Sequence, residues 1–237
     1  MGFTVEVEEW VGSIWHRFIT RRASPDFPEA RVELSEQQRA LALLFRAVGG
    51  ASGVAVEAAS GRNLVLRRSL LQKVAGTCQQ LPLAWCDAGS LRLPPQLAVY
   101  PDLELNRELY RWLALLAAQA GEMRHWARDN QRWTRELLQR FPALLPRYQR
   151  LVDAHLALRP DSKTLNPAEA ALEQALCQAL RDPGSVKQFP RSERAPWPLP
   201  LWLYPAEQLG APQAGDLDEE SDSNLLTPPD QQALVCK

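Results

Sequence analysis

The stretch from Asn106 to Leu145, NRELYRWLALLAAQAGEMRHWARDNQRWTRELLQRFPALL, decides the fold of this chain. Its apolar side chains recur at steps of three and four residues, which places them on one face of a helix, and a smaller apolar face lies beside it. A helix with two apolar sides normally packs inside a domain. We therefore predict a central helix that the rest of the chain covers, capped by Asp102 or Asn106 and weakened at Gly121. The larger face comprises Leu105, Leu109, Trp112, Leu113, Leu116, Ala120 and Met123, and the smaller one Tyr110, Ala114, Ala117 and Gly121.

Helical patterns also precede this stretch. Ser35 followed by Gln38 resembles a capping box, and it predicts a helix that runs to Val48 and stops at Gly49-Gly50. Residues 67–76 indicate another helix that Gly76 ends. Residues 6–22 predict an amphipathic helix with acidic side chains in its first turn and arginines in its last, in agreement with the helix dipole. Its apolar residues are Val7, Val11, Ile14, Trp15, Phe18 and Ile19, its acidic residues are Glu6, Glu8 and Glu9, and its final arginines are Arg21 and Arg22.

The signals for β-structure are few. Residues 82–94 alternate apolar and polar side chains around a turn at Ala88-Gly89, which predicts an antiparallel hairpin. Because an isolated hairpin is marginal in water, it must lie on the central helix or pair with a short strand near Val54–Val56. Residues 53–59 favour such a strand, with a helix as the alternative.

Further helices follow the central stretch, at 129–140 and at 145–159. The sequence Asn166-Pro167-Ala168-Glu169 places an Asn cap, a first-turn proline and an acidic residue at a helix start, so it predicts a well-bounded helix that ends before Asp182. The proline-rich residues 190–205 favour an extended arm that packs back on the helices through Trp197, Trp202 and Tyr204.

These elements predict a mainly α-helical domain with a small antiparallel β-hairpin. We expect the helical domain to span residues 1–209 and an acidic, disordered tail or the start of a linker to span residues 210–237. The tail carries Asp216, Asp218, Glu219, Glu220 and Asp222.

Composition narrows the class of protein. The 237 residues are 46 % hydrophobic and 23 % charged, which is ordinary for a globular protein, and the formal net charge of −1 gives no global attraction for nucleic acid or an anionic membrane. No apolar run reaches the roughly 18 residues of a membrane span, and no secretory leader is visible, so we expect a cytoplasmic protein. The four cysteines are scattered, without a CxxC pair for zinc or redox chemistry.

Catalytic and metal-binding motifs are missing from the sequence. The three histidines, His16, His125 and His155, have no metal-ligand spacing, and no HExxH, nucleophile elbow or phosphate loop occurs. We therefore predict no enzymatic activity, no cofactor, and no catalytic or metal residue. The alternative is a metal-dependent hydrolase with an unrecognised site, for which His125 and Glu122 are the least poor candidates.

One local feature can recognise a partner. A row of arginines with two tryptophans, at helical spacing, can clasp an acidic protein surface or stack nucleobases. The structural alternative is a solvated helix face that two buried tryptophans anchor. The balanced charge favours a protein partner over a helical nucleic-acid-binding module. The row consists of Arg124, Arg128, Arg132 and Arg135 with Trp126 and Trp133.

Several phrases together resemble a known family. They are Glu9-Trp10-Val11-Gly12 with Trp15-His16-Arg17, Phe45-Arg46-Ala47 with Gly49-Gly50, Leu91-Arg92-Leu93-Pro94, and Asn106-Arg107-Glu108-Leu109-Tyr110-Arg111-Trp112. Over residues 5–205 the chain resembles the N-terminal region of the CbbO/NorD family. These are adaptors of MoxR-type AAA+ ATPases of the CbbQ/NorQ kind, and they activate ribulose-bisphosphate carboxylase (Rubisco) or nitric oxide reductase.

The resemblance implies a non-catalytic adaptor that binds the ATPase ring, with the carboxylase as the slightly preferred client and nitric oxide reductase as the other. Family members also carry a von Willebrand factor A domain with a DxSxS metal motif, which this sequence lacks. Asp222-Ser223-Asn224 does not fit that motif, so no metal residue is carried over. We expect a fragment or truncated product that contains the ATPase-facing domain.

Overall fold

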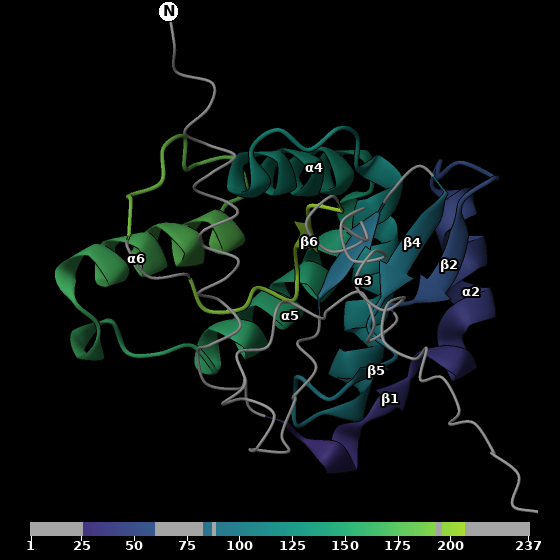
Figure 1. Cartoon of the computed structure of the whole chain (residues 1–237), viewed down its shortest axis with the longest axis horizontal. Coiled ribbons are helices and arrows are strands. Elements are labelled where there is room, and N and C mark those ends of the chain that lie inside the picture. Colours follow the sequence, from purple (N-terminus) through teal and green to yellow (C-terminus); the bar gives the residue numbers. More distant parts are fainter. Residues whose placement is uncertain (1–25, 60–82, 87–88, 193–195, 207–237) are drawn as a thin grey trace, which may run out of the picture.

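The computed structural model describes residues 26–59, 83–86, 89–192 and 196–206 (Figure 1). The helices predicted at 6–22 and 67–76, the tail predicted at 210–237 and the domain boundary at 209 lie outside these residues. Within them, helices predominate and a small sheet accompanies them, in agreement with the predicted mainly α-helical class.

Helix α3, Leu103–Gln119, forms the centre of the molecule. Its cap is Asp102, whose carboxylate accepts the N–H of Glu104 at 2.8 Å. Helices α2 (Leu34–Ala47), α4 (Trp126–Arg140) and α5 (Leu145–Ala157) all pack against it. This arrangement confirms the predicted central helix, because both of its apolar faces are covered.

The chain leaves the helical path after Gln119, so the long stretch is divided between separate helices. Ala120 is extended, with φ −68° and ψ 133°. Asp129 then builds a new helix start, since its carboxylate accepts the N–H groups of Arg124 (2.8 Å) and His125 (2.6 Å). Open space surrounds Gly121, so no close contact requires a glycine there.

Helix α2 differs from the prediction at its start. It begins at Leu34 after Glu33, without a side-chain cap, and Ser35 lies inside its first turn, so the predicted capping box is wrong. The predicted stop is confirmed: Gly49 has φ +111°, and a Cβ on Gly50 would lie 2.3 Å from the ring of Phe45. Both glycines are required by backbone geometry or close packing.

The predicted hairpin is the middle of a four-stranded sheet ordered β2-β4-β3-β6. Strands β3 (Ala84–Cys86) and β4 (Ser90–Leu93) pair antiparallel. Strand β2 (Ala55–Ala58) pairs parallel with β4, so the expected pairing near Val54–Val56 is confirmed. Strand β6 (Leu203–Tyr204) pairs parallel with β3. A second sheet joins β1 (Val32–Glu33) to β5 (Gln96–Leu97), following the 3-10 turn η1 (Pro28–Ala30).

The C-terminal half closes the core. After η3 (Pro142–Leu144) and α5, the turn η4 (Ser162–Thr164) leads to α6 (Pro167–Arg181). The amide oxygen of Asn166 accepts the Glu169 N–H at 2.9 Å, which confirms the predicted cap. The proline-rich arm runs back between the helices and ends in β6, with Trp202 and Tyr204 buried, so its predicted return to the helices is also confirmed.

Candidate interaction site

Helix α4 presents its buried face to the sheet and the C-terminal arm. The Trp126 indole N–H donates to the Leu203 carbonyl at 2.9 Å, and its ring packs on Trp202 and Tyr204. The side chain of Asn130 bonds to both backbone groups of Leu203. Its NH₂ donates to the Leu203 carbonyl, and its oxygen accepts the Leu203 N–H. Helix α4 therefore anchors β6 to the core.

A second buried amide fastens the loop after α6 to helix α4. The side-chain oxygen of Gln131 accepts the N–H groups of Gly184 (3.1 Å) and Val186 (3.3 Å), and its NH₂ donates to the Val186 carbonyl. Gln131 and its neighbour Asn130 are both buried. Buried amides of this kind hold a loop only where nearly all of their hydrogen bonds are satisfied.

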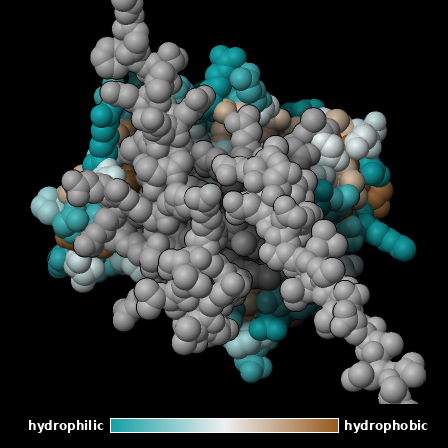
Figure 2. Space-filling view, viewed as in Figure 1, coloured by the Kyte–Doolittle hydropathy of each residue, from teal (hydrophilic) through white to brown (hydrophobic). Residues whose placement is uncertain are grey.

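The opposite face of α4 carries three of the four predicted arginines. Arg128, Arg132 and Arg135 are exposed and follow one another at i, i+4 and i+7, which places them within about 60° of one another around the helix. Arg124, also exposed, precedes the helix. In the space-filling view, mostly hydrophilic surface marks the upper edge, where α4 lies in Figure 1 (Figure 2).

These arginines are tethered to different extents. Arg132 contacts Asp129 at 3.2 Å, and Arg124 contacts Glu122 at 3.0 Å with both side chains 74 % exposed. Arg135 packs over Gly184, where an added Cβ would lie 2.8 Å from its guanidinium. Arg128 has no hydrogen-bond or ion-pair partner among the described residues. The stripe Arg128, Arg132 and Arg135, which we call the arginine face, is thus open to a charged partner.

The two tryptophans of the predicted row lie elsewhere. Trp126 and Trp133 are about 140–160° around the helix from Arg128, and Trp133 is 2 % exposed. They anchor α4 to the core, so the expectation that they supply contact area for a partner does not fit their positions. The sequence contained this signal, because residues two and five positions from Arg128 lie on the far side of a helix.

A buried charge cluster joins the end of α5 to α6 and the arm. Arg159 makes a two-pronged ion pair with Glu173, both about 5 % exposed or less, and one of its N–H groups donates to the Pro198 carbonyl at 3.0 Å. His155 contacts Arg159 at 3.0 Å, and burial together with the Arg159 charge lowers the pKa of His155 from 6.5 to about 3. The sequence indicated no metal-ligand role for His155, and it gave no signal for the pairing of Arg159 with Glu173.

Within the described ranges, no three His, Cys, Asp or Glu side chains gather as a metal site would require. The hydrolase candidates Glu122 and His125 lie at the start of α4, where Glu122 pairs with Arg124 and the backbone of His125 bonds to Asp129. No helix among these residues is both long and apolar enough to cross a membrane.

The fold and these surfaces define a mainly α-helical domain whose buried polar groups join its helices to the loops and the C-terminal arm. Comparison with known proteins identifies the relatives of this domain. The chain is 74 % identical over 233 residues to Protein NorD of Stutzerimonas stutzeri, covering 98 % of this chain and 38 % of that protein. It is 61 % identical to an uncharacterized protein of Pseudomonas aeruginosa, over 93 % of this chain and 36 % of that protein.

A more distant relative carries the same protein name. Protein NorD of Brucella abortus is 32 % identical over 90 % of this chain, which corresponds to 37 % of the relative. The chain is therefore a NorD-like region, as its sequence phrases predicted, and it spans less than two fifths of the length of these relatives. No family model and no solved structure matches it.

Proposed function

We propose that this chain is a non-catalytic accessory domain that works with a MoxR-type AAA+ ATPase to activate nitric oxide reductase in the cytoplasm. The observation that carries the proposal is the 74 % identity to a NorD protein over almost the whole chain. The ATPase and the reductase come from the resemblance of the sequence to the CbbO/NorD family. Because the named relatives are NorD proteins, we now favour nitric oxide reductase over Rubisco as the client.

The arrangement of polar groups supports an accessory role. The buried groups that could perform acid–base chemistry, His155 and Glu173, are held by Arg159 between two helices and the arm. A general acid or base must reach a reacting atom in a cleft, and these groups face the interior. The arginine face, in contrast, points outward from a helix that the core holds rigidly.

The arginine face is the contact that we propose for the ATPase ring. Guanidinium groups form paired hydrogen bonds with carboxylates, so such a stripe suits an acidic protein surface. A nucleic-acid site would need exposed aromatic side chains beside the arginines for base stacking. Here Trp133 is 2 % exposed although Arg132 lies over its ring, and Trp126 packs on Trp202 and Tyr204. The geometry therefore favours a protein partner over single-stranded nucleic acid.

The proposed client is tested in the organism that encodes the chain. Deleting its gene should abolish nitric oxide consumption while the reductase subunits are still made, and the unaltered gene should restore consumption. A deletion strain that consumes nitric oxide normally would contradict the proposed client. Loss of carboxylase activity in its place would return the assignment to Rubisco. The neighbouring genes offer an independent check, since a reductase operon should surround the gene.

A further inference from the structure

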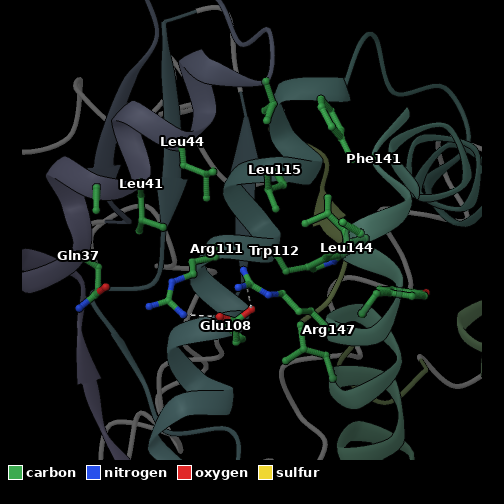
Figure 3. Close-up of a pocket in the computed structure, with 15 residues that line it drawn as sticks. Gln37, Leu41, Leu44, Glu108, Arg111, Trp112, Leu115, Phe141, Leu144 and Arg147 are labelled. Atoms are coloured by element: carbon green, nitrogen blue, oxygen red, sulfur yellow. Dashed lines mark hydrogen bonds and ion pairs between the residues drawn. The ribbon is translucent and has the colours of Figure 1, made fainter. Parts of the chain in front are cut away.

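An apolar groove lies on the side of α3 away from the sheet. Its floor is Trp112 and Leu115, one wall is α2, and the other is η3 with the start of α5 (Figure 3). The groove holds about 440 Å³ of space. We propose that it is a docking site for the N-terminal segment of this same chain, residues 6–22. The inference is independent of the proposed function.

The shape of the groove suits a helix. Gln37, Leu41, Leu44 and Val48 line it from α2, and their spacing of i, i+4, i+7 and i+11 makes one continuous stripe. Over eleven residues a helix rises about 16 Å, which sets the length of the groove along α2. Helices α2 and α5 each pack on α3, so a helix in the groove would contact all three. Amphipathic helices bind such grooves through apolar anchors at these spacings.

The N-terminal segment has matching anchors. Val7, Val11, Ile14 and Phe18 follow the same spacing of i, i+4, i+7 and i+11, and they span the same length of about 16 Å if the segment is helical, as its pattern predicts. These side chains need apolar cover, since a solvent-exposed face of this size is unfavourable. Leu44, Leu144 and Phe141 in the groove are themselves only partly buried.

The start of the described chain gives the direction of docking. Strand β1 leads directly into α2, whose Gln37 lines the groove at the same end as Glu108 (Figure 3). The segment would therefore enter at the Glu108 end, since four residues from Arg22 to Asp26 can span about 13 Å. It would run antiparallel to α2, an orientation in which the dipoles of the two helices attract.

Charge at the far end of the groove agrees with this direction, whereas the near end carries Glu108 together with Arg111 and Arg147. The far end of the groove is formed by Val48 and Phe141, and Arg140 lies there over the Phe141 ring, with its guanidinium 3.5 Å from the Cβ position of Gly49. The first turn of the segment carries Glu6, Glu8 and Glu9, and antiparallel docking brings these carboxylates toward Arg140. The reverse direction would place Arg21 and Arg22 beside this arginine instead.

Amide hydrogen exchange of the full 237-residue chain, followed by mass spectrometry, tests the proposal. Residues 6–22 should exchange at least tenfold more slowly than an unstructured peptide. Leu44→Glu inside the groove should abolish that protection. Ala143→Glu provides a second groove variant at an exposed site, where folding is not at risk, and it should act in the same way. The matched control is Leu43→Glu, which changes a 66 % exposed leucine outside the groove and should leave the protection unchanged.

Three results would overturn the proposal. The first is exchange of residues 6–22 at unprotected rates in the unaltered chain, and the second is protection that survives both groove variants. Protection that depends on protein concentration would place the segment on a second copy of the chain and not in its own groove. Exchange of α3 in the same samples shows whether each variant is folded.

Discussion

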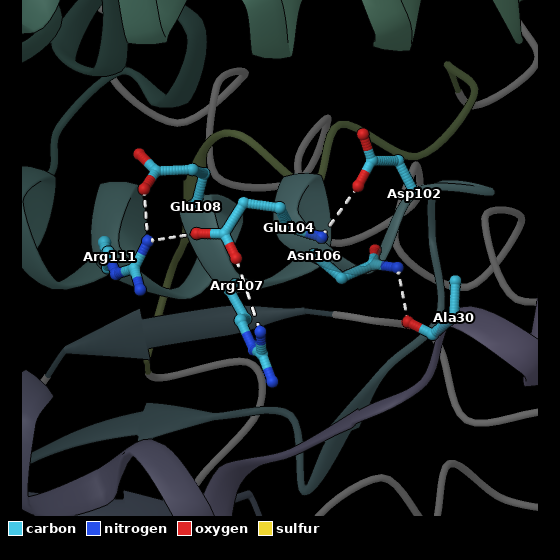
Figure 4. Close-up of polar contacts among 7 residues, drawn as sticks. All are labelled: Ala30, Asp102, Glu104, Asn106, Arg107, Glu108 and Arg111. Atoms are coloured by element: carbon cyan, nitrogen blue, oxygen red, sulfur yellow. Dashed lines mark hydrogen bonds and ion pairs between the residues drawn. The ribbon is translucent and has the colours of Figure 1, made fainter.

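Asn106 shows how one side chain fixes the central helix to the rest of the fold (Figure 4). Its amide oxygen accepts the N–H groups of Val99 and Tyr100, both at 3.0 Å, and its NH₂ donates to the carbonyls of Ala30 and Tyr100, both at 2.8 Å. The sequence offered Asn106 as an alternative helix cap. The structure gives the cap to Asp102 and uses Asn106 to join the loop before α3 to the turn before β1.

We expect Asn106→Leu to lower the free energy of unfolding by about 3 kcal/mol or more, because four buried backbone groups lose their partner. Asn166→Ala is the matched control. It removes a surface cap and should cost about 1 kcal/mol. Urea denaturation of both variants measures the difference. Equal losses for the two variants would show that the hydrogen bonds of Asn106 contribute no more than an ordinary cap.

At the scale of elements, the sequence predicted those whose signals are local. Asn166, Pro167 and Glu169 define the start of α6 within four residues, and Gly49-Gly50 ends α2 through geometry that few other residues allow. The hairpin was visible for the same reason, since its alternation and its turn are neighbours in the sequence. Local signals of this kind predict an element correctly because they do not depend on contacts with distant residues.

The elements that were missed depend on distant residues. The first turn of α2 is set by the Leu34 N–H bond to Pro95. The break after Gln119 is the exception, since the Asp129 contacts that start α4 span only four and five residues. Strand β6 exists because Asn130 and Trp126 hold Leu203 beside β3. The sequence showed the arginines as a row at helical spacing. To place Trp126 and Trp133 on the other side of α4, the angular position of each residue around the helix also had to be counted.

The junction of α5, α6 and the arm should make stability depend on pH. The pKa of His155 falls from 6.5 to about 3 on folding, so the unfolded chain binds a proton between these values that the folded chain does not. Stability from this group is therefore complete above about pH 6.5 and is lost as the pH falls toward 3, by up to about 1.4 kcal/mol per pH unit.

The variant His155→Gln isolates this effect. Between pH 7 and pH 5 the unaltered chain should lose stability more steeply than the variant, as measured by urea denaturation at each pH. The charged partners at the junction, Arg159 and Glu173, remain in both proteins. Identical slopes would mean that His155 is protonated in the folded state, contrary to its burial beside a guanidinium.

The described part of the molecule is a helical domain with a continuous core and two different surfaces. The arginine face lies on the outer side of α4, and the apolar groove lies between α2, α3 and α5. The core between them is continuous, since α3 contacts α2, α4 and α5. A partner bound at α4 would therefore contact a helix that packs on the central helix, which suits the proposed coupling to a ring ATPase.

We propose that the arginine face binds the ATPase ring, and the decisive measurement is the binding affinity of the full chain for the cognate MoxR-type ATPase. We predict that the unaltered chain co-purifies with the ring and that Arg128→Glu with Arg132→Glu weakens binding at least about tenfold, because like charges would then meet. Arg39→Glu with Arg150→Glu, a matched reversal of exposed arginines on α2 and α5, should leave the affinity within about twofold. Equal affinity of the two double variants, or no binding by the unaltered chain, would contradict the claim.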